Sequence, residues 1–243
     1  MQDRVGPKRG RIVKLREMLY HYGIVLNGID KLAFGGSNKM GDPTKFLSLA
    51  EYYIFNISLT MLILFEFVIM LFTLKGNKSS TKKRSDNGTI FLVFLAFYGS
   101  IFLAIIFRGH QITGAIKEWV LPYSFYYIGI AMILLGIGIR GIAILTLKRA
   151  FTLSVQTTEE QHLIQNGLYK IVRNPAYTGS IISLLGVAFA YRHILSTICV
   201  ILLCFICYGA RIKIEEKALE KQFQQEFKSY CLHTKYRLFP GIF

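Results

Sequence analysis

The sequence predicts an all-α, polytopic helical membrane protein with about five transmembrane helices. Of its 243 residues, 53% are hydrophobic and the mean hydropathy is +0.41, which is too apolar for a globule with a polar surface. Lys and Arg number 29 against 14 Asp and Glu, and on so apolar a chain basic residues typically mark the cytoplasmic ends of membrane spans. The composition therefore excludes a soluble enzyme, a disordered chain and a nucleic-acid-binding module.

Residues 1–50 form a basic N-terminal region. An apolar stretch at 18–34 follows six Lys and Arg residues and is interrupted by polar side chains. Because no small-residue cleavage site follows this stretch, it does not have the pattern of a signal peptide. We expect a helix that lies on the membrane surface, with a disordered tail as the alternative.

Residues 51–125 hold the first two spans and their loops. The runs 53–74 and 90–107 are each long enough to cross a hydrocarbon core of about 30 Å, and the second carries no charge. The first contains Glu66, which is costly in lipid and is therefore expected either to serve function or to pair inside the protein with Arg140. Five basic residues lie in the loop between the two spans.

Residues 126–243 open with a third span, 126–147, whose single charge is Arg140. The next apolar run, 178–210, has Arg192 and His193 in its middle and would be about 50 Å long as one helix. It is therefore predicted to be a tight helical hairpin. The second helix of this hairpin is expected to extend beyond the membrane, because an apolar stripe continues at four-residue spacing through Leu219, Phe223 and Phe227.

The distribution of basic residues predicts the orientation. Lys and Arg near the span ends gather in the first loop, the third loop and the C-terminal tail, and are few in the second loop and the hairpin turn. The positive-inside rule then places the first group, and any site built from it, on the cytoplasmic side.

Two local patterns predict a binding site at this boundary. Asn174 followed by Pro175 is typical of a helix start, because Asn is a favoured N-cap and Pro fits the first helical position. The first free backbone donors, at 176–178, would lie beside Arg173 and attract an anion. Further along, Arg211 and Glu215 share one helix face. The two residues could form a plain ion pair with each other. Alternatively, they could contact a lipid head group and a water-soluble cofactor at the membrane boundary.

The polar positions of the third region resemble the isoprenylcysteine carboxyl methyltransferase family, which are integral membrane enzymes that use S-adenosylmethionine. The resemblance covers about residues 140–243. It rests on Gly167-Leu168-Tyr169, on Arg173-Asn174-Pro175-Ala176-Tyr177-Thr178-Gly179, on Glu215-Glu216, on the stretch 223–230 and on Arg237-Leu238-Phe239-Pro240.

The resemblance implies roles for individual residues. Arg211 corresponds to the arginine that holds the substrate carboxylate and is the catalytic candidate, and Arg140 matches a recurring position and is a second substrate-binding candidate. The chain departs from the family at Asn174, where His is usual, and at Leu168, where Pro is frequent. The implied cofactor-binding residues are Gln161, His162, Leu163, Ile164, Tyr169, Arg173, Asn174, Pro175, Ala176, Tyr177, Glu215 and Glu216.

The implied function is methyl transfer from S-adenosylmethionine to a lipophilic acceptor at the membrane interface, with carboxyl O-methylation of an isoprenylcysteine-like substrate as the expected reaction. The expected partners are the lipid bilayer and a lipophilic small molecule or lipidated protein C-terminus, with no metal and no nucleic acid. Two alternatives remain at this point. One is a membrane reductase of the sterol type that uses NADPH, and the other is a non-catalytic protein of the same fold.

Overall fold

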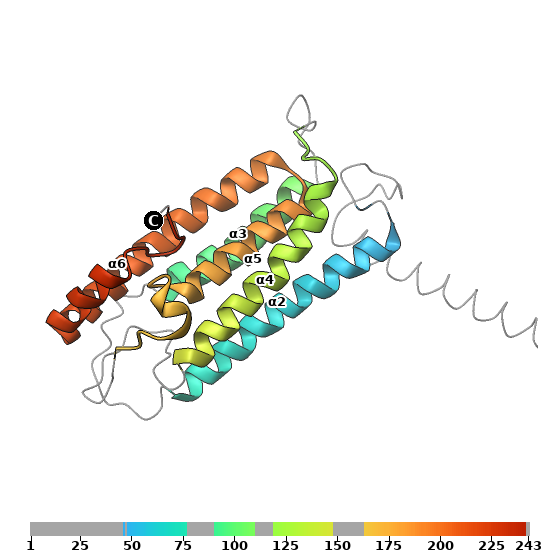
Figure 1. Cartoon of the computed structure of the whole chain (residues 1–243). Coiled ribbons are helices and arrows are strands. Elements are labelled where there is room, and N and C mark those ends of the chain that lie inside the picture. Colours follow the sequence, from blue (N-terminus) through green and yellow to red (C-terminus); the bar gives the residue numbers. More distant parts are fainter. Residues whose placement is uncertain (1–45, 47, 77–89, 110–118, 148–162, 242–243) are drawn as a thin grey trace, which may run out of the picture. The chain divides into compact units, whose positions relative to one another are not determined.

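The computed structural model describes residue 46 and residues 48–76, 90–109, 119–147 and 163–241 (Figure 1). All of them belong to one compact unit, Pro43–Phe243. The long helices are α2 (Leu49–Gly76), α3 (Ile90–Gly109), α4 (Ser124–Leu147), α5 (Pro175–Tyr191) and α6 (Ile194–His233), and a short 3-10 helix, η4 (Gly167–Lys170), precedes α5. Within these ranges there is no β-strand, which confirms the all-helical class. The expected surface helix at 18–34 lies outside the described residues.

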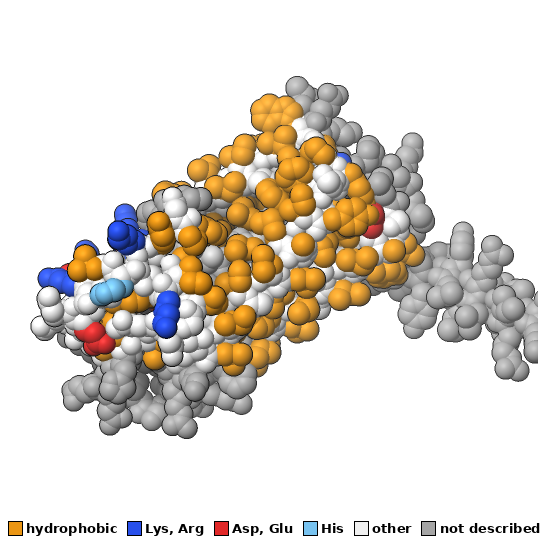
Figure 2. Space-filling model, in the orientation of Figure 1, with side chains coloured by type: hydrophobic (Ala, Val, Ile, Leu, Met, Phe, Trp, Pro, Cys, Tyr) orange, Lys and Arg blue, Asp and Glu red, His pale blue; other side chains and the backbone are white. Residues whose placement is uncertain are grey.

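Helices lie at each of the predicted apolar runs, but among the described residues three of them, not five, are long and apolar enough to cross a membrane. By length and composition, α2, α4 and α6 can cross a membrane, whereas α3 and α5 are shorter apolar helices. Apolar side chains cover the flank of the bundle, and most of the visible charged side chains gather at the end where α6 finishes (Figure 2). A lipid-spanning helix must satisfy its backbone internally and present an apolar surface outside, and this distribution fits that requirement.

The predicted hairpin is present, and its turn lies at Arg192. This residue has a left-handed backbone conformation (φ 61°), and its N–H donates to the carbonyl of Phe189, which closes α5. The segment that precedes α4 holds the turn, because Leu121 N–H donates to the Arg192 carbonyl at 2.7 Å and the Arg192 side chain donates back to the Leu121 carbonyl at 3.0 Å. The hairpin therefore reverses within two residues, as the run of 178–210 required.

Small residues allow α4 and α5 to pack at very short distance. A Cβ added at Gly136 of α4 would lie 2.5 Å from the Gly179 carbonyl oxygen of α5. One turn further on, Ser183 Oγ donates to the Ile133 carbonyl at 3.2 Å. Close backbone approach through small residues is the usual way in which membrane helices associate, and here it fixes the first turn of α5 against Arg140.

Helix α6 continues past its apolar half, as predicted, and is interrupted by non-helical backbone at Gln224 (φ 40°, ψ −105°). Beyond this kink, Phe227 and Tyr230 are buried, whereas Leu219 and Phe223 of the predicted stripe are only half-buried. The chain then runs back along α6, so that residues 234–238 meet the start of α5.

Candidate active site

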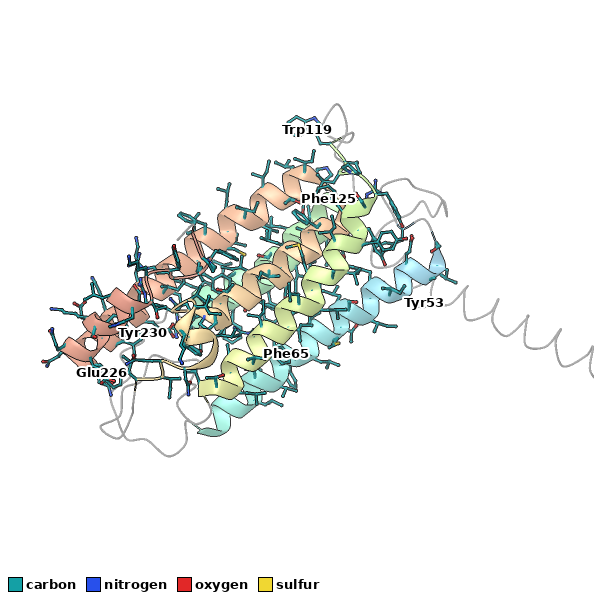
Figure 3. All side chains as sticks on the ribbon, viewed as in Figure 1. Tyr53, Phe65, Trp119, Phe125, Glu226 and Tyr230 are labelled. Atoms are coloured by element: carbon teal, nitrogen blue, oxygen red, sulfur yellow. The ribbon has the colours of Figure 1, made fainter. Side chains whose placement is uncertain are left out.

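The predicted site residues converge at one end of the bundle. Figure 3 shows Tyr230 and Glu226, near the end of α6, at the opposite end of the bundle from Trp119 and Phe125. Near Tyr230 lie η4 and the start of α5, because the Tyr230 hydroxyl donates to the Tyr169 carbonyl at 2.7 Å. The polar groups described below come from α2, α4, the start of α5, α6 and the C-terminal segment.

Among the residues that the structure describes, Arg211 is the most deeply buried cation, with no exposed side-chain surface. Its Nε donates to the Tyr177 hydroxyl at 3.2 Å, and its Nη2 lies 3.3 Å from Glu215 Oε1. The ion pair that the spacing allowed is therefore real, yet it is not a surface pair, because α5 covers Arg211 and supplies Tyr177. Glu215 keeps 24% of its side-chain surface exposed, so the pair has one buried and one accessible member.

Arg140 is held inside the bundle by two other helices. Its Nη2 donates to Glu66 Oε2 of α2 at 2.9 Å, and its Nη1 donates to the Ala176 carbonyl of α5 at 3.1 Å. The expected pairing of Glu66 with Arg140 is thus confirmed. Arg140 joins α2 and α4 to the first turn of α5, and its contact with substrate stays a prediction.

Arg173 and Glu216 are engaged with each other rather than left open toward a ligand. Arg173 Nε donates to Glu216 Oε1 at 2.9 Å, and Arg237 Nε donates to Glu216 Oε2 at 2.9 Å. Each oxygen of this carboxylate therefore already accepts from an arginine. Arg173 Nη1 also donates to the carbonyls of Thr234 and Lys235. Both side chains thus have partners within the protein, and the cofactor contact that the resemblance implied for them stays a prediction.

The start of α5 corrects two expectations. The helix begins at Pro175 as predicted, but the Asn174 side chain makes no capping hydrogen bond and its Nδ2 donates instead to the Arg237 carbonyl at 3.3 Å. The backbone N–H groups of Tyr177 and Thr178 both donate to the Asn174 carbonyl, so two of the three donors expected to be free are used. The helix start therefore offers fewer free donors than its sequence suggested, and an anion site there stays a prediction.

An apolar cluster lies beside these charges. Tyr169, Ala176 and Ala143 form its buried part, and Ile164 packs against it. Burial raises the pKa of the Tyr169 hydroxyl, and the negative charge of Glu215 raises it further. The phenol therefore stays neutral at physiological pH and offers an aromatic face near a carboxylate. Leu163 is half-buried, and Gln161 and His162 lie outside the described residues.

Sequence reasoning missed the contribution of the C-terminal segment. Arg237 was part of the recognised Arg237-Leu238-Phe239-Pro240 motif, but the motif carried no role because its target lies more than 60 residues away in the chain. The structure shows that the Arg237 carbonyl accepts from the N–H of Asn174, and that the carbonyl of Tyr236, just before the motif, accepts from the N–H of Arg173. No local pattern could have shown this pairing.

Comparisons with known proteins find relatives of part of the chain. Residues 124–226 match the family described as phospholipid methyltransferase. A probable protein-S-isoprenylcysteine O-methyltransferase of Oryza sativa subsp. japonica is 34% identical over 107 residues, which are 43% of this chain and 56% of that protein. Protein-S-isoprenylcysteine O-methyltransferase B of Arabidopsis thaliana is 32% identical over 105 residues, 42% of this chain and 53% of that protein. The chain thus spans about half the length of the curated relatives it matches.

A solved structure shares the fold over most of the chain. The structure of the eukaryotic intramembrane Ras methyltransferase ICMT (isoprenylcysteine carboxyl methyltransferase) without a monobody has a TM-score of 0.54 and 18% sequence identity, and the match covers 91% of this chain and 84% of that one. The likeness shows a common polytopic membrane fold. The sequence similarity to the isoprenylcysteine O-methyltransferases is confined to about 43% of the chain.

Proposed function

We propose that this protein is an S-adenosylmethionine-dependent methyltransferase that acts at the membrane interface and methylates the carboxylate of an isoprenylcysteine-like acceptor. The observation that carries the proposal is the buried Arg211, held between Tyr177 of α5 and Glu215 of α6. A buried cation beside a partly exposed carboxylate, at the place where an apolar helix becomes polar, provides for an anionic lipid-linked substrate and a polar cofactor side by side. The proposal is supported by the matched relatives, which are named as protein-S-isoprenylcysteine O-methyltransferases or as probable ones.

The residues around Arg211 and Tyr169 fit the proposed cofactor. An adenosine group needs an apolar or aromatic surface for its base and a carboxylate for its ribose hydroxyls, and a sulfonium is attracted to aromatic faces. The apolar cluster around Tyr169 supplies a surface for the base. Glu215, whose negative charge raises the pKa of Tyr169, supplies the carboxylate for the ribose hydroxyls. We therefore propose Glu215, Tyr169, Tyr177 and residues 161–164 as the cofactor-binding set.

The proposed reaction needs placement more than proton transfer. S-adenosylmethionine, when bound, supplies an activated methyl group on a positively charged sulfur. The acceptor carboxylate is already ionised, so its oxygen forms the new O–C bond as the S–C bond breaks, and no proton has to be removed. Arg211 would orient this carboxylate through paired N–H donors. Alignment and exclusion of water can contribute roughly 7 to 11 kcal/mol in such a site.

Binding and transfer measurements on the purified protein test the proposal. Isothermal titration with S-adenosylmethionine should show binding, and a prenylated cysteine incubated with methyl-labelled cofactor should yield a labelled, base-labile ester. Binding of NADPH without binding of S-adenosylmethionine would support the sterol-type reductase instead. Binding of neither ligand would support a non-catalytic protein.

Two substitutions on α6 separate the proposed roles. Arg211→Ala should abolish turnover with little loss of cofactor affinity, and Arg211→Lys should restore turnover poorly because an ammonium lacks the planar fork. Glu215→Gln should weaken cofactor binding by about 1.5 to 3 kcal/mol, the value of a charged hydrogen bond. Glu220→Gln, an exposed carboxylate one turn further along α6, is the control. If Arg211→Ala and Glu215→Gln have small and equal effects on turnover and cofactor affinity, the two residues form only an ion pair and the assignment is refuted.

We also propose that the site faces the cytoplasm and receives its acceptor from the bilayer. The support is the concentration of basic residues in the loops and tail next to the site. The lipid tail of the acceptor would then lie among the apolar helices, and its carboxylate would reach Arg211 at the boundary.

A further inference from the structure

We propose that Glu216 is a positioning residue that clamps the C-terminal segment, residues 234–238, onto the start of α5 and thereby maintains the proposed cofactor site. We call this segment the C-terminal clasp. The proposal rests on the proposed function for its effect on S-adenosylmethionine, and on the contacts below for the clamp itself.

The clasp is bound to the start of α5 mainly through the backbone. The N–H of Arg173 donates to the Tyr236 carbonyl and that of Asn174 to the Arg237 carbonyl, both at 2.9 Å. Thr178 Oγ1 then donates to the Leu238 carbonyl at 2.8 Å. Three consecutive carbonyls of the clasp are thus matched to one short stretch, so the position of each segment determines that of the other.

Glu216 forms two ion pairs where the clasp meets the start of α5, one with Arg173 and one with Arg237. In these described ion pairs it is the single negative charge between two arginines. Arg173 approaches one carboxylate oxygen and Arg237 the other, each at 2.9 Å. The Glu216 side chain is 11% exposed, so water screens these charges only partly. Without the carboxylate, the largely buried guanidinium of Arg173 would face that of Arg237, which is 35% exposed, with no counter-charge between them, and the two would repel each other. Loss of Glu216 is therefore expected to open the clasp rather than to remove a single bond.

The clasp is connected to the proposed site through Tyr177. This residue follows Asn174 by less than one helical turn, and its hydroxyl accepts from Arg211 Nε at 3.2 Å. Glu215 and Glu216 are neighbours in sequence but face different partners, since Glu215 pairs with Arg211 and Glu216 with Arg173. If the clasp opens, the start of α5 is freed, and cofactor affinity falls in proportion to the fraction of molecules that keep the competent arrangement.

The experiment measures S-adenosylmethionine affinity by titration calorimetry and backbone amide exchange by mass spectrometry in full-length protein. The variants are Glu216→Gln, Arg237→Gln, both together, and Arg237→Lys. The matched control is Glu220→Gln. We expect each Gln variant to weaken affinity roughly tenfold, as a competent fraction of about one tenth implies, and the double variant to be no weaker than either single variant.

Further readouts separate positioning from simple instability. Turnover at saturating cofactor should stay near that of the wild type in Arg237→Gln, whereas its KM for the cofactor rises. Arg237→Lys should restore much of the affinity, because the charge is kept. Amide exchange at residues 173–178 should speed up in Glu216→Gln and remain unchanged in Glu220→Gln.

Two results would overturn the proposal. The first is an unchanged affinity in Arg237→Gln beside a weakened Glu216→Gln, because that pattern means that Glu216 contacts the cofactor directly. The second is unchanged amide exchange at 173–178 in Glu216→Gln. Failure of the wild type to bind S-adenosylmethionine would refute the proposed function instead, and amide exchange, which needs no ligand, would still decide whether Glu216 closes the clasp.

Discussion

Replacement of Glu66 by Gln should destabilise the protein strongly, because it leaves a buried cation without its counter-charge. Arg140 has 3% of its side-chain surface exposed and Glu66 has 14%. Removal of one partner from a buried ion pair costs about 3 to 5 kcal/mol. We expect the lower end of this range, about 3 kcal/mol, because Arg140 Nη1 keeps its bond to the Ala176 carbonyl.

The assay is thermal unfolding of the purified protein in detergent. For a chain of this size, about 1 kcal/mol corresponds to roughly 2 to 4 °C, so the melting temperature should fall by about 6 to 12 °C. The combined variant Glu66→Leu with Arg140→Met should recover most of this loss, because it removes both charges and refills the space with apolar groups. A fall of less than about 2 °C in the single variant, or a double variant no more stable than the single one, would refute the reasoning.

Three further predictions concern packing, positioning and orientation. Gly136→Ala should destabilise the protein by about 1 to 3 kcal/mol, because its Cβ would lie 2.5 Å from a backbone oxygen of α5. The control Gly138→Ala places a Cβ where nothing lies within 4 Å and should be neutral or stabilising. Equal shifts of the melting temperature in the two variants would contradict the close packing. Tyr177→Phe should raise the KM for the acceptor by roughly tenfold or more, since a charged hydrogen bond to Arg211 is lost. Cofactor affinity should be preserved, because Phe keeps the aromatic ring proposed to meet the cofactor, and an unchanged acceptor KM would exclude this role. Single cysteines introduced at Ser80 and Phe243, in a background without native cysteines, should not react with an impermeant reagent in intact cells. Labelling of either cysteine would refute the predicted orientation.

Several features of the fold were predictable because their physical causes are local. The spans could be found from apolar runs, since a helix in lipid must be apolar along most of its length. The hairpin turn followed from a run too long for one span with Arg192 and His193 in its middle. The start of α5 at Pro175 followed from the fixed φ and missing donor of proline.

The sequence predicted which residues form the candidate site better than it predicted how those residues contact one another. Arg211 and Glu215 could be paired from their spacing on one helix, because residues four apart are neighbours there. That Arg211 is fully buried, however, depends on α5, which brings Tyr177 against it. The spacing alone allowed an exposed surface pair equally well.

What the sequence determined by itself is the set of membrane helices, their order and the residue types available at the boundary. The tertiary structure decided which of those residues meet. Glu215 and Glu216 are identical side chains at adjacent positions, yet one pairs with Arg211 and the other holds Arg173 and Arg237 together. Asn174, whose side chain could have capped α5, donates to the Arg237 carbonyl instead. The contacts of Glu216 and Asn174 depend on partners more than 20 residues away. Successive side chains on a helix point about 100° apart, so each bonds to whichever element packs on its own side.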